Sequence, residues 1–301
     1  MQRRKFIEHV GWTGLGIVWS LGSNGLMTSC QVGSSKTHKG STTALSFVQI
    51  SDSHIGFNKA ANEHVTETLQ RTIKAINALP TQPAFVVHTG DITQLSKPAE
   101  FDQAKQILSQ LKAPLFTIPG EHDTIGDLGK AYSEAFAAPQ KQEGLQSWDQ
   151  SGVHFVSLTN VLAFGLDGKG QVGQSQLEVL KKDLSSQSSD TPIVLFSHIP
   201  LYDVYPEWGW ATEDSAQVLD LLSRFSAVTV LSGHIHQVIQ HTEGNILFQT
   251  AASTAFPLPA PGKAKSPTPV KLPPNELFTA LGFRTVELMP NDDPQITQHA
   301  L

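Results

Sequence analysis

Residues 45–54 read LSFVQISDSH, an apolar run followed at once by an acid and an imidazole. The apolar and β-branched side chains of residues 45–50 are typical of a buried strand. Asp52 and His54 come directly after it, and side chains two residues apart in extended backbone project to the same side. The stretch therefore predicts a strand that delivers a carboxylate and an imidazole to one place.

Four further polar clusters follow predicted strands in the same way. In chain order they are Gly90-Asp91 after 84–88, Gly120-Glu121-His122-Asp123 after 115–118, Ser197-His198 after 193–196, and Gly233-His234-Ile235-His236 after 228–231. The glycines in these clusters allow tight turns and a close approach of the backbone.

Strands alternate with helical periodicity along the whole chain after residue 44. Helices are predicted over 63–79, 98–111, 174–184 and 215–225. Further strands are predicted over 153–158, 161–166, 238–241, 246–250 and 283–288, the first two as a hairpin. This alternation is typical of an α/β sheet with crossover helices, where ligands bind outside the carboxyl ends of the strands. We therefore expect the five polar clusters to meet.

Such a meeting of carboxylates and imidazoles predicts a metal site. Calcium prefers oxygen ligands only, whereas a mixed nitrogen and oxygen set suits Mn, Fe or Zn. Asp91 has two carboxylate oxygens and could bridge two ions. A single Asp-x-His or His-x-His is weak evidence, but five clusters at five strand ends form a joint signal.

Composition argues against a disordered chain, a nucleic-acid-binding protein and a cysteine-based site. The 301 residues are 39% hydrophobic and 16% charged, which is enough to bury a sizeable core. The formal charge of -6, without a basic stretch beyond the first residues, disfavours a nucleic-acid partner. The single cysteine, Cys30, excludes an intramolecular disulfide and a cysteine zinc site.

The first residues predict an export signal. Arg3-Arg4 followed by Phe6 and an apolar run to Met27 is typical of a twin-arginine signal peptide over 1–30. Small residues before Cys30 resemble a lipoprotein cleavage box, which would make Cys30 the lipidated N-terminus; ordinary cleavage or an uncleaved anchor are the alternatives. Residues 31–43 suit a flexible tether. We therefore expect a protein of the periplasm or cell envelope, in contact with the membrane only through a lipid at Cys30.

The order of the five clusters resembles that of the calcineurin-like metallophosphoesterase superfamily, which reads Asp-x-His, Gly-Asp, Gly-Asn-His-Asp/Glu, His and Gly-His-x-His. The resemblance covers about residues 45–252. It implies a four-layer α-β-β-α sandwich with a dimetal site at the C-terminal ends of the strands. The pattern of elements shows no domain boundary within 44–301, which we interpret as one domain that includes the proline-rich residues 256–274. The implied activity is hydrolysis of phosphodiester or phosphomonoester bonds in a small-molecule substrate, with water activated between two metal ions. Residues 48–54 are similar to the cyclic-nucleotide phosphodiesterase branch, and the tract over 205–257 to exported bacterial members.

The resemblance also implies a role for each motif residue. One metal would be held by Asp52, His54, Asp91 and His236, and the other by Asp91, Glu121, His198 and His234. His122 would be the catalytic residue that assists the leaving oxygen. Asp123 or Asp52 would orient its ring.

Glu121 departs from the family pattern, which has a neutral asparagine there. Its negative charge lowers the net positive charge of the site and the Lewis acidity of the metals. Three interpretations stay open: a mixed ferric/divalent metal pair, a preference for singly charged diesters, or a Glu121 that turns away. A different class of function is a non-catalytic metal-binding surface lipoprotein with a repurposed site.

Two other features could shape a substrate pocket. Trp208 and Trp210 could wall it and stack on a base, or could equally cover the edge of the core. Residues 256–274 contain seven prolines and predict an extended arm that either shields the pocket or ties down the C-terminus. His88, inside a predicted strand, is expected to be a core or supporting residue.

Overall fold

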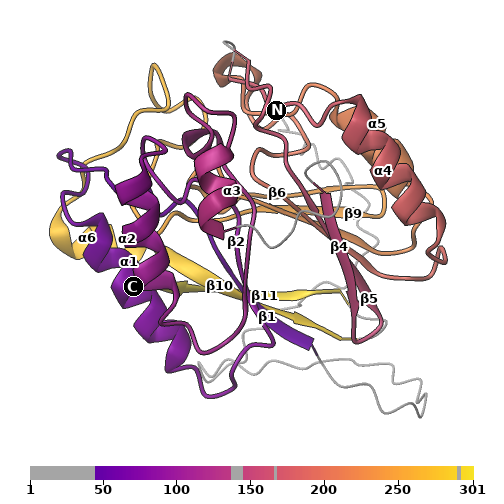
Figure 1. Cartoon of the computed structure of the whole chain (residues 1–301), viewed down its shortest axis with the longest axis horizontal. Coiled ribbons are helices and arrows are strands. Elements are labelled where there is room, and N and C mark those ends of the chain that lie inside the picture. Colours follow the sequence, from indigo (N-terminus) through magenta and orange to yellow (C-terminus); the bar gives the residue numbers. More distant parts are fainter. Residues whose placement is uncertain (1–44, 137–144, 166–167, 290–292) are drawn as a thin grey trace, which may run out of the picture. The chain divides into compact units, whose positions relative to one another are not determined.

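Two β-sheets lie face to face in the computed structural model, which describes residues 45–136, 145–165, 168–289 and 293–301 (Figure 1). The five-stranded sheet has the order β11-β10-β1-β2-β3 and the six-stranded sheet the order β4-β5-β6-β7-β9-β8. The predicted signal peptide, the tether and Cys30 lie outside the described residues. Within the described residues, no helix combines the length and the apolar character that crossing a membrane requires.

The strands are β1 (Leu45–Ile50), β2 (Val86–His88), β3 (Leu115–Thr117), β4 (Leu145–Gln150), β5 (Val153–Leu158), β6 (Ile193–Ser197), β7 (Val228–Ser232), β8 (Gln240–Glu243), β9 (Ile246–Thr250), β10 (Gly282–Leu288) and β11 (Gln295–Ala300). The α-helices are α1 (Val65–Asn77), α2 (Pro98–Leu108), α3 (Lys130–Phe136), α4 (Gln174–Ser185), α5 (Ser215–Leu222) and α6 (Pro274–Ala280). Short 3-10 turns span Glu121–Asp123 and Pro206–Trp208.

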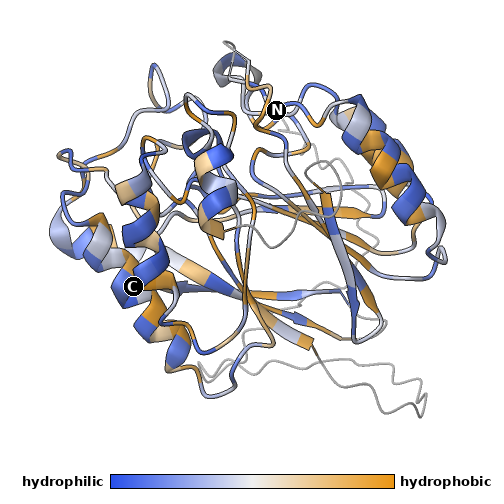
Figure 2. Ribbon diagram, in the orientation of Figure 1, coloured by the Kyte–Doolittle hydropathy of each residue, from blue (hydrophilic) through white to orange (hydrophobic). Residues whose placement is uncertain are grey.

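Period-two alternation along the strands produces the layers. In β1, Phe47 faces the core between the sheets, whereas Val48 and Ile50 face the core under the helices α1, α2 and α3. The outer face of the second sheet is covered in the same way by α4 and α5. Figure 2 shows the apolar stripes of these helices turned toward the sheets. The predicted four-layer α-β-β-α sandwich is thus confirmed.

The parallel strands bring the polar clusters to one edge. β1, β2 and β3 run parallel in the first sheet, and β5, β6, β7 and β9 run parallel in the second. The clusters that follow β1, β2, β3, β6 and β7 therefore all leave the carboxyl ends of parallel strands.

One predicted pairing is wrong. Residues 161–165 form no strand, and β5 pairs antiparallel with β4 instead. The sequence of β4, LQSWDQ, lacks an apolar run because this strand lies at the edge of its sheet, where alternate side chains are partly exposed. The edge strand β11 escapes prediction for the same reason.

His154 in β5 joins the edge strand β4 to helix α4. Its Nδ1 lies 2.8 Å from Asp149 of β4, and its Nε2 lies 2.8 Å from Asp183 of α4. Burial lowers the pKa of His154, but the hydrogen bonds and charges of Asp183 and Asp149 outweigh burial and raise its pKa above the ordinary value of 6.5. The imidazolium form therefore stabilises the folded state.

A raised pKa in the folded state gives a contribution that is complete below the unfolded pKa and is lost as the pH rises through the folded value. We expect the difference in unfolding free energy between the wild type and the His154→Gln variant to shrink by on the order of 1 kcal/mol between pH 6 and pH 9. Asp149 is largely exposed, so most of this effect belongs to Asp183. Urea denaturation at a series of pH values measures the difference, and a gap that widens with pH would contradict this assignment.

Candidate metal centre

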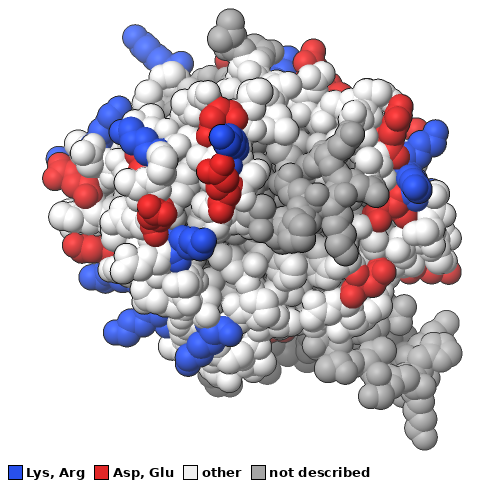
Figure 3. Space-filling view, in the orientation of Figure 1, with Lys and Arg blue, Asp and Glu red and all other residues white. Residues whose placement is uncertain are grey.

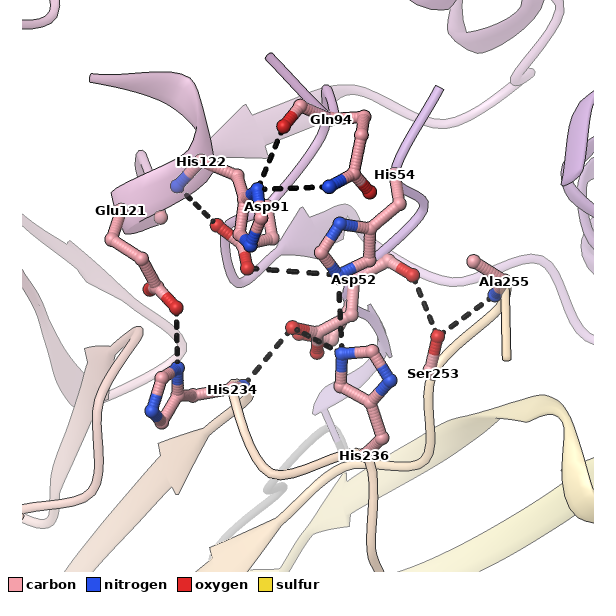
Figure 4. Close-up of polar contacts among 12 residues, drawn as sticks. Asp52, His54, Asp91, Gln94, Glu121, His122, His234, His236, Ser253 and Ala255 are labelled. Atoms are coloured by element: carbon pink, nitrogen blue, oxygen red, sulfur yellow. Dashed lines mark hydrogen bonds and ion pairs between the residues drawn. The ribbon is translucent and has the colours of Figure 1, made fainter. Parts of the chain in front are cut away.

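The five polar clusters meet at the carboxyl ends of the strands. Figure 4 shows six of the predicted ligands, which turn toward one another from different loops: Asp52, His54, Asp91, Glu121, His234 and His236. The seventh, His198, follows β6 and contacts Glu121 and Asp91. The structure thus brings together all seven residues that the sequence predicts as ligands.

The backbone at these ligands is left-handed rather than extended, which corrects the geometry expected for Asp-x-His and His-x-His. Positive φ occurs at five of them: Asp52, His54, Asp91, His234 and His236, with φ of 54°, 43°, 54°, 69° and 53°. This conformation is unusual for residues other than glycine and is typical of functional sites. Backbone bonds hold it here: the Asp52 amide donates to Gly90 O (3.0 Å), and the His54 amide to Asp91 O (2.9 Å).

Glycine is required on both sides of Asp91. Gly90 has φ of +98°, and a Cβ there would lie 2.3 Å from His198 Nδ1. A Cβ on Gly120 would lie 2.1 Å from Asp91 Oδ1. Gly233 faces Ser51 and Asp52 in a similarly tight way. The close approach predicted for these three glycines is present.

Asp52, His54 and His236 form the first group of donor atoms. His236 Nε2 lies 3.4 Å from Asp52 Oδ1 and 3.1 Å from His54 Nε2. One donor atom from each of the three side chains lies within 4.8 Å of the others, which is a suitable spacing around one cation.

Asp91, Glu121, His198 and His234 form the second group, within the same 4.8 Å limit. The two oxygens of Glu121 lie 2.8 Å from His198 Nε2 and 2.8 Å from His234 Nδ1. Glu121 therefore points into the centre, and the interpretation in which it turns away is wrong.

Asp91 lies between the two groups. Its Oδ2 is 3.6 Å from His54 Nε2 in the first group and 3.5 Å from His198 Nε2 in the second. Its Oδ1 accepts a hydrogen bond from the His122 amide at 2.9 Å. This is the place that a carboxylate bridging two cations would take.

Unpaired donor atoms show that the residues fit metal ions. Of the buried side-chain atoms in the described residues that lack a hydrogen-bond partner, five belong to the ligand side chains: Asp52 Oδ2, His54 Nδ1, Glu121 Oε2, His198 Nε2 and His234 Nδ1. The last three side chains meet one another as ion pairs around Glu121. A buried polar atom without a hydrogen bond costs about 1–3 kcal/mol. Cations at this position would satisfy ligand atoms that the protein leaves without hydrogen bonds.

Backbone carbonyls orient two imidazoles. A carbonyl can only accept, so Nδ1 of His198 donates to Thr89 O (2.7 Å) and Nδ1 of His236 donates to Phe256 O (2.6 Å). Each Nε2 then faces the centre, where it would ligate a cation after giving up any proton that it carries; Asp91 and Glu121 raise the pKa of His198, so a cation would displace a proton from its Nε2. Such a partner behind a ligand imidazole is common in metal sites and fixes its orientation.

The charge states also suit a cation site. Burial lowers the pKa of His54 to about 3, which keeps this imidazole neutral and able to ligate. Burial raises the pKa of Glu121, but His234 and His198 outweigh burial and hold its pKa well below the usual range. A neutral imidazole and an ionised carboxylate are the forms that bind metals.

His122 is held by Gln94, a residue that is not one of the seven predicted metal ligands. Its Nδ1 lies 2.7 Å from the Gln94 carbonyl oxygen, and one of its ring nitrogens lies within 4.8 Å of donor atoms of His54 and Asp91. Burial lowers the pKa of His122, but Asp91 and Glu121 outweigh burial and raise it above the usual value. The ring is therefore suited to carry a proton beside the metal ligands. Gln94 is a residue that the sequence did not indicate.

Asp123 does not orient His122, which corrects that expectation. Its carboxylate accepts hydrogen bonds from the amides of Ile92, Thr93 and Gly120 at 2.9, 2.7 and 3.0 Å. Burial and the nearby Asp91 raise the pKa of Asp123 to about 6. The residue instead ties the loop after β2 to the loop after β3, so it supports Asp91 from behind. His88, as expected, is a buried support that contacts Ser53 at 2.9 Å.

The ligands open into a cavity of about 470 Å³. Trp210 lines it, with its ring 6.5 Å from that of His234. Trp208 is not among the residues that line the cavity and packs edge-on against Trp210, with ring centroids 4.9 Å apart. Of the two alternatives for the tryptophans, a place in the wall therefore applies to Trp210 but not to Trp208. The proline-rich segment contributes Phe256, Leu258 and further residues to the same wall.

The family model described as calcineurin-like phosphoesterase matches residues 45–238. The chain belongs to this family. As a calcineurin-like phosphoesterase it is a metal-dependent hydrolase of phosphate esters, and the dinuclear character of the family agrees with the two groups of donor atoms.

Relatives of this calcineurin-like phosphoesterase include named phosphodiesterases. A probable glycerophosphodiester phosphodiesterase of Arcobacter nitrofigilis is 28% identical, over 68% of this chain and 77% of the relative. A 3',5'-cyclic adenosine monophosphate phosphodiesterase of Escherichia coli is 27% identical, over 63% of this chain and 69% of the relative. A dimetal phosphatase from Danio rerio has the same fold, with a TM-score of 0.63 at 13% identity, over 85% of this chain and 96% of that one.

Proposed function

We propose that this enzyme is an exported phosphodiesterase that prefers singly charged diesters to doubly charged monoesters. The observation that carries the proposal is the position of Glu121, whose carboxylate contacts both His198 and His234 at 2.8 Å. It adds a third negative charge to those of Asp52 and Asp91. Each positive charge that the site loses weakens its attraction for a dianionic monoester more than its attraction for a monoanionic diester, because the Coulomb energy scales with the charge of the substrate. The names of the relatives above agree with this preference.

The seven ligand side chains would hold two metal ions. Their nitrogen and oxygen donors suit Mn, Fe or Zn. Bound there, the ions would act as Lewis acids on the phosphoryl oxygens and lower the pKa of water toward neutrality.

The residues around the metals have separate tasks. Asp91 fixes the spacing between the two donor groups, and its Oδ1 holds the His122 amide. The His122 ring, anchored at Nδ1 by Gln94, can donate a proton from its other nitrogen to the oxygen of the departing alcohol. Trp210 and Phe256 exclude water from one side of the cavity.

Removing the charge of Glu121 tests the preference. In the Glu121→Gln variant, which keeps the side-chain size, we expect the ratio of kcat/KM for bis(p-nitrophenyl) phosphate over p-nitrophenyl phosphate to fall by roughly 10- to 100-fold. The Glu121→Asn variant, with the residue usual in the family, should shift in the same direction. Both variants are compared at equal, measured metal content.

An unchanged ratio at full metal content would overturn the proposed preference. No turnover of either ester, or of cyclic nucleotides, by metal-loaded wild type would favour the non-catalytic metal-binding lipoprotein instead.

Export and lipid anchoring are supported by the paired arginines and by the small residues before Cys30. A substrate outside the cytoplasm would be a small phosphate ester rather than a nucleic acid. On the face shown in Figure 3, Lys and Arg side chains are interspersed with Asp and Glu. Cell fractionation tests the location, and recovery only in the cytoplasm would contradict it.

A further inference from the structure

The wall of the active-site cavity comes in part from outside the segment that the family model matches. That match ends at residue 238, whereas Leu258, Pro267, Pro269 and Lys271 of the proline-rich arm line the cavity. The cavity floor is formed by metal ligands, and the arm faces it. The arm is therefore placed to contact the organic part of a substrate whose phosphate is bound by the metal ligands on the cavity floor.

The arm is held against the ligands themselves. Phe256 accepts the hydrogen bond of His236 Nδ1 at 2.6 Å, and its ring packs against His54 with centroids 4.8 Å apart. Gln237 Nε2 donates to Leu258 O. Further along, the Val270 amide donates to Pro257 O at 2.9 Å, which brings the second half of the arm back to the first. Proline restricts the backbone between these points, so the wall is formed before substrate binds.

The cavity wall combines apolar surface with two cations. Phe57, Phe256 and Trp210 supply broad apolar faces. Lys59 and Lys271 also line the cavity, and both are exposed. Neither lysine forms an ion pair with a carboxylate in the described part of the chain. Two lysines without an ion-pair partner among the described residues thus line a cavity whose floor, in the proposed function, would hold one phosphate.

We propose that Lys59 and Lys271 form a subsite for a second phosphate, carried at the far end of the organic part of the substrate. This inference rests on the proposed phosphodiesterase function and names its substrate class: a phosphodiester with an apolar or aromatic body and a distal phosphate monoester. The body lies on the aromatic and proline surfaces, since flat rings stack well on such faces. The lysines act as point charges on the distal group.

A matched pair of chromogenic substrates tests the subsite. Both are 4-nitrophenyl esters of thymidine 5'-phosphate, and only one carries a phosphate on the 3'-hydroxyl. The wild type should have the lower KM for the 3'-phosphorylated ester. In the Lys59→Ala/Lys271→Ala double variant this KM should rise roughly 3- to 30-fold, the range for one or two exposed ion pairs, with kcat unchanged. The ester without the 3'-phosphate should be unaffected, and added salt should reduce the wild-type advantage.

Lys263→Ala/Lys265→Ala is the matched control, because these two lysines lie on the same arm but do not line the cavity. This variant should behave as the wild type. Equal KM values for the two esters in the wild type, or an equal loss in both double variants, would overturn the subsite and leave the phosphodiesterase function standing.

Binding separates the subsite from catalysis. Calorimetry with thymidine 3',5'-bisphosphate and thymidine 5'-phosphate reports the distal contact without turnover. Tighter binding of the bisphosphate that disappears in Lys59→Ala/Lys271→Ala supports the subsite even if neither ester is hydrolysed, a result that would count against the proposed function alone. Identical dissociation constants for the two ligands would overturn the subsite.

Discussion

Replacing His122 with Asn is expected to lower kcat by roughly 10²- to 10⁴-fold while the metal content stays that of the wild type. The Gln94 carbonyl anchors the ring at Nδ1. His122 belongs to neither of the two groups of donor atoms described above, although one of its ring nitrogens lies near His54 and Asp91. Its loss therefore removes a proton donor without removing a ligand. Turnover and elemental analysis of the same preparation measure both quantities.

The leaving group shows whether His122 acts as the acid. An aryl diester that releases a strongly acidic phenol needs little protonation, so the variant should lose much less activity on it than on an alkyl diester. His64→Asn, which changes an exposed histidine at the start of α1, is the control and should match the wild type. A loss that is equal for all leaving groups, or that accompanies metal loss, would show that His122 has another role.

The second large effect is expected at Asp91. The Asp91→Asn variant keeps the size of the side chain but removes the charge placed between the two donor groups, 3.6 Å from His54 and 3.5 Å from His198. We expect both metals to bind more weakly and turnover to fall by more than roughly 10²-fold, since even partners behind the ligands cost 10- to 100-fold.

A comparison with His236→Ala distinguishes a shared ligand from an ordinary one. His236 contacts only the first group, so its loss should weaken one metal and leave the other. Metal stoichiometry after dialysis against a weak chelator, determined by mass spectrometry, measures the two variants side by side. If Asp91→Asn and His236→Ala each lost a single ion, Asp91 would not bridge.

The ligands could be predicted from the sequence because each follows an apolar strand whose end is easily recognised. The parallel strands then determine that these ends meet, as they do for Asp52, Asp91 and His198. The backbone at Asp52 and Asp91 could not be predicted in this way. Its left-handed conformation depends on amide contacts between neighbouring loops, which no local pattern encodes.

The residues that support the site, and the edge strands, are harder to predict from the sequence. Gln94 contacts the His122 ring through its main-chain oxygen at 2.7 Å, which carries no information about residue type, and through its side-chain amide at 3.2 Å, which no motif marks. Phe256 likewise contributes a main-chain carbonyl to His236. The edge strands β4 and β11 lack an apolar face, so their polar sequences resemble loops. The sequence could not decide whether the proline-rich arm shields the pocket or ties down the C-terminus. The position of the arm depends on contacts between residues far apart in sequence, such as that between Phe256 and His236, which are 20 residues apart.

The position of β1 in its sheet has a consequence for biosynthesis. β1 lies between β2 and β10, and Leu45 pairs with Leu288, far along the sequence. Until β10 has been synthesised, one edge of β1 has unpaired amide and carbonyl groups. We therefore expect the metals to be captured only after β10 has been synthesised. Such an order of assembly would suit the proposed twin-arginine export, which moves folded proteins.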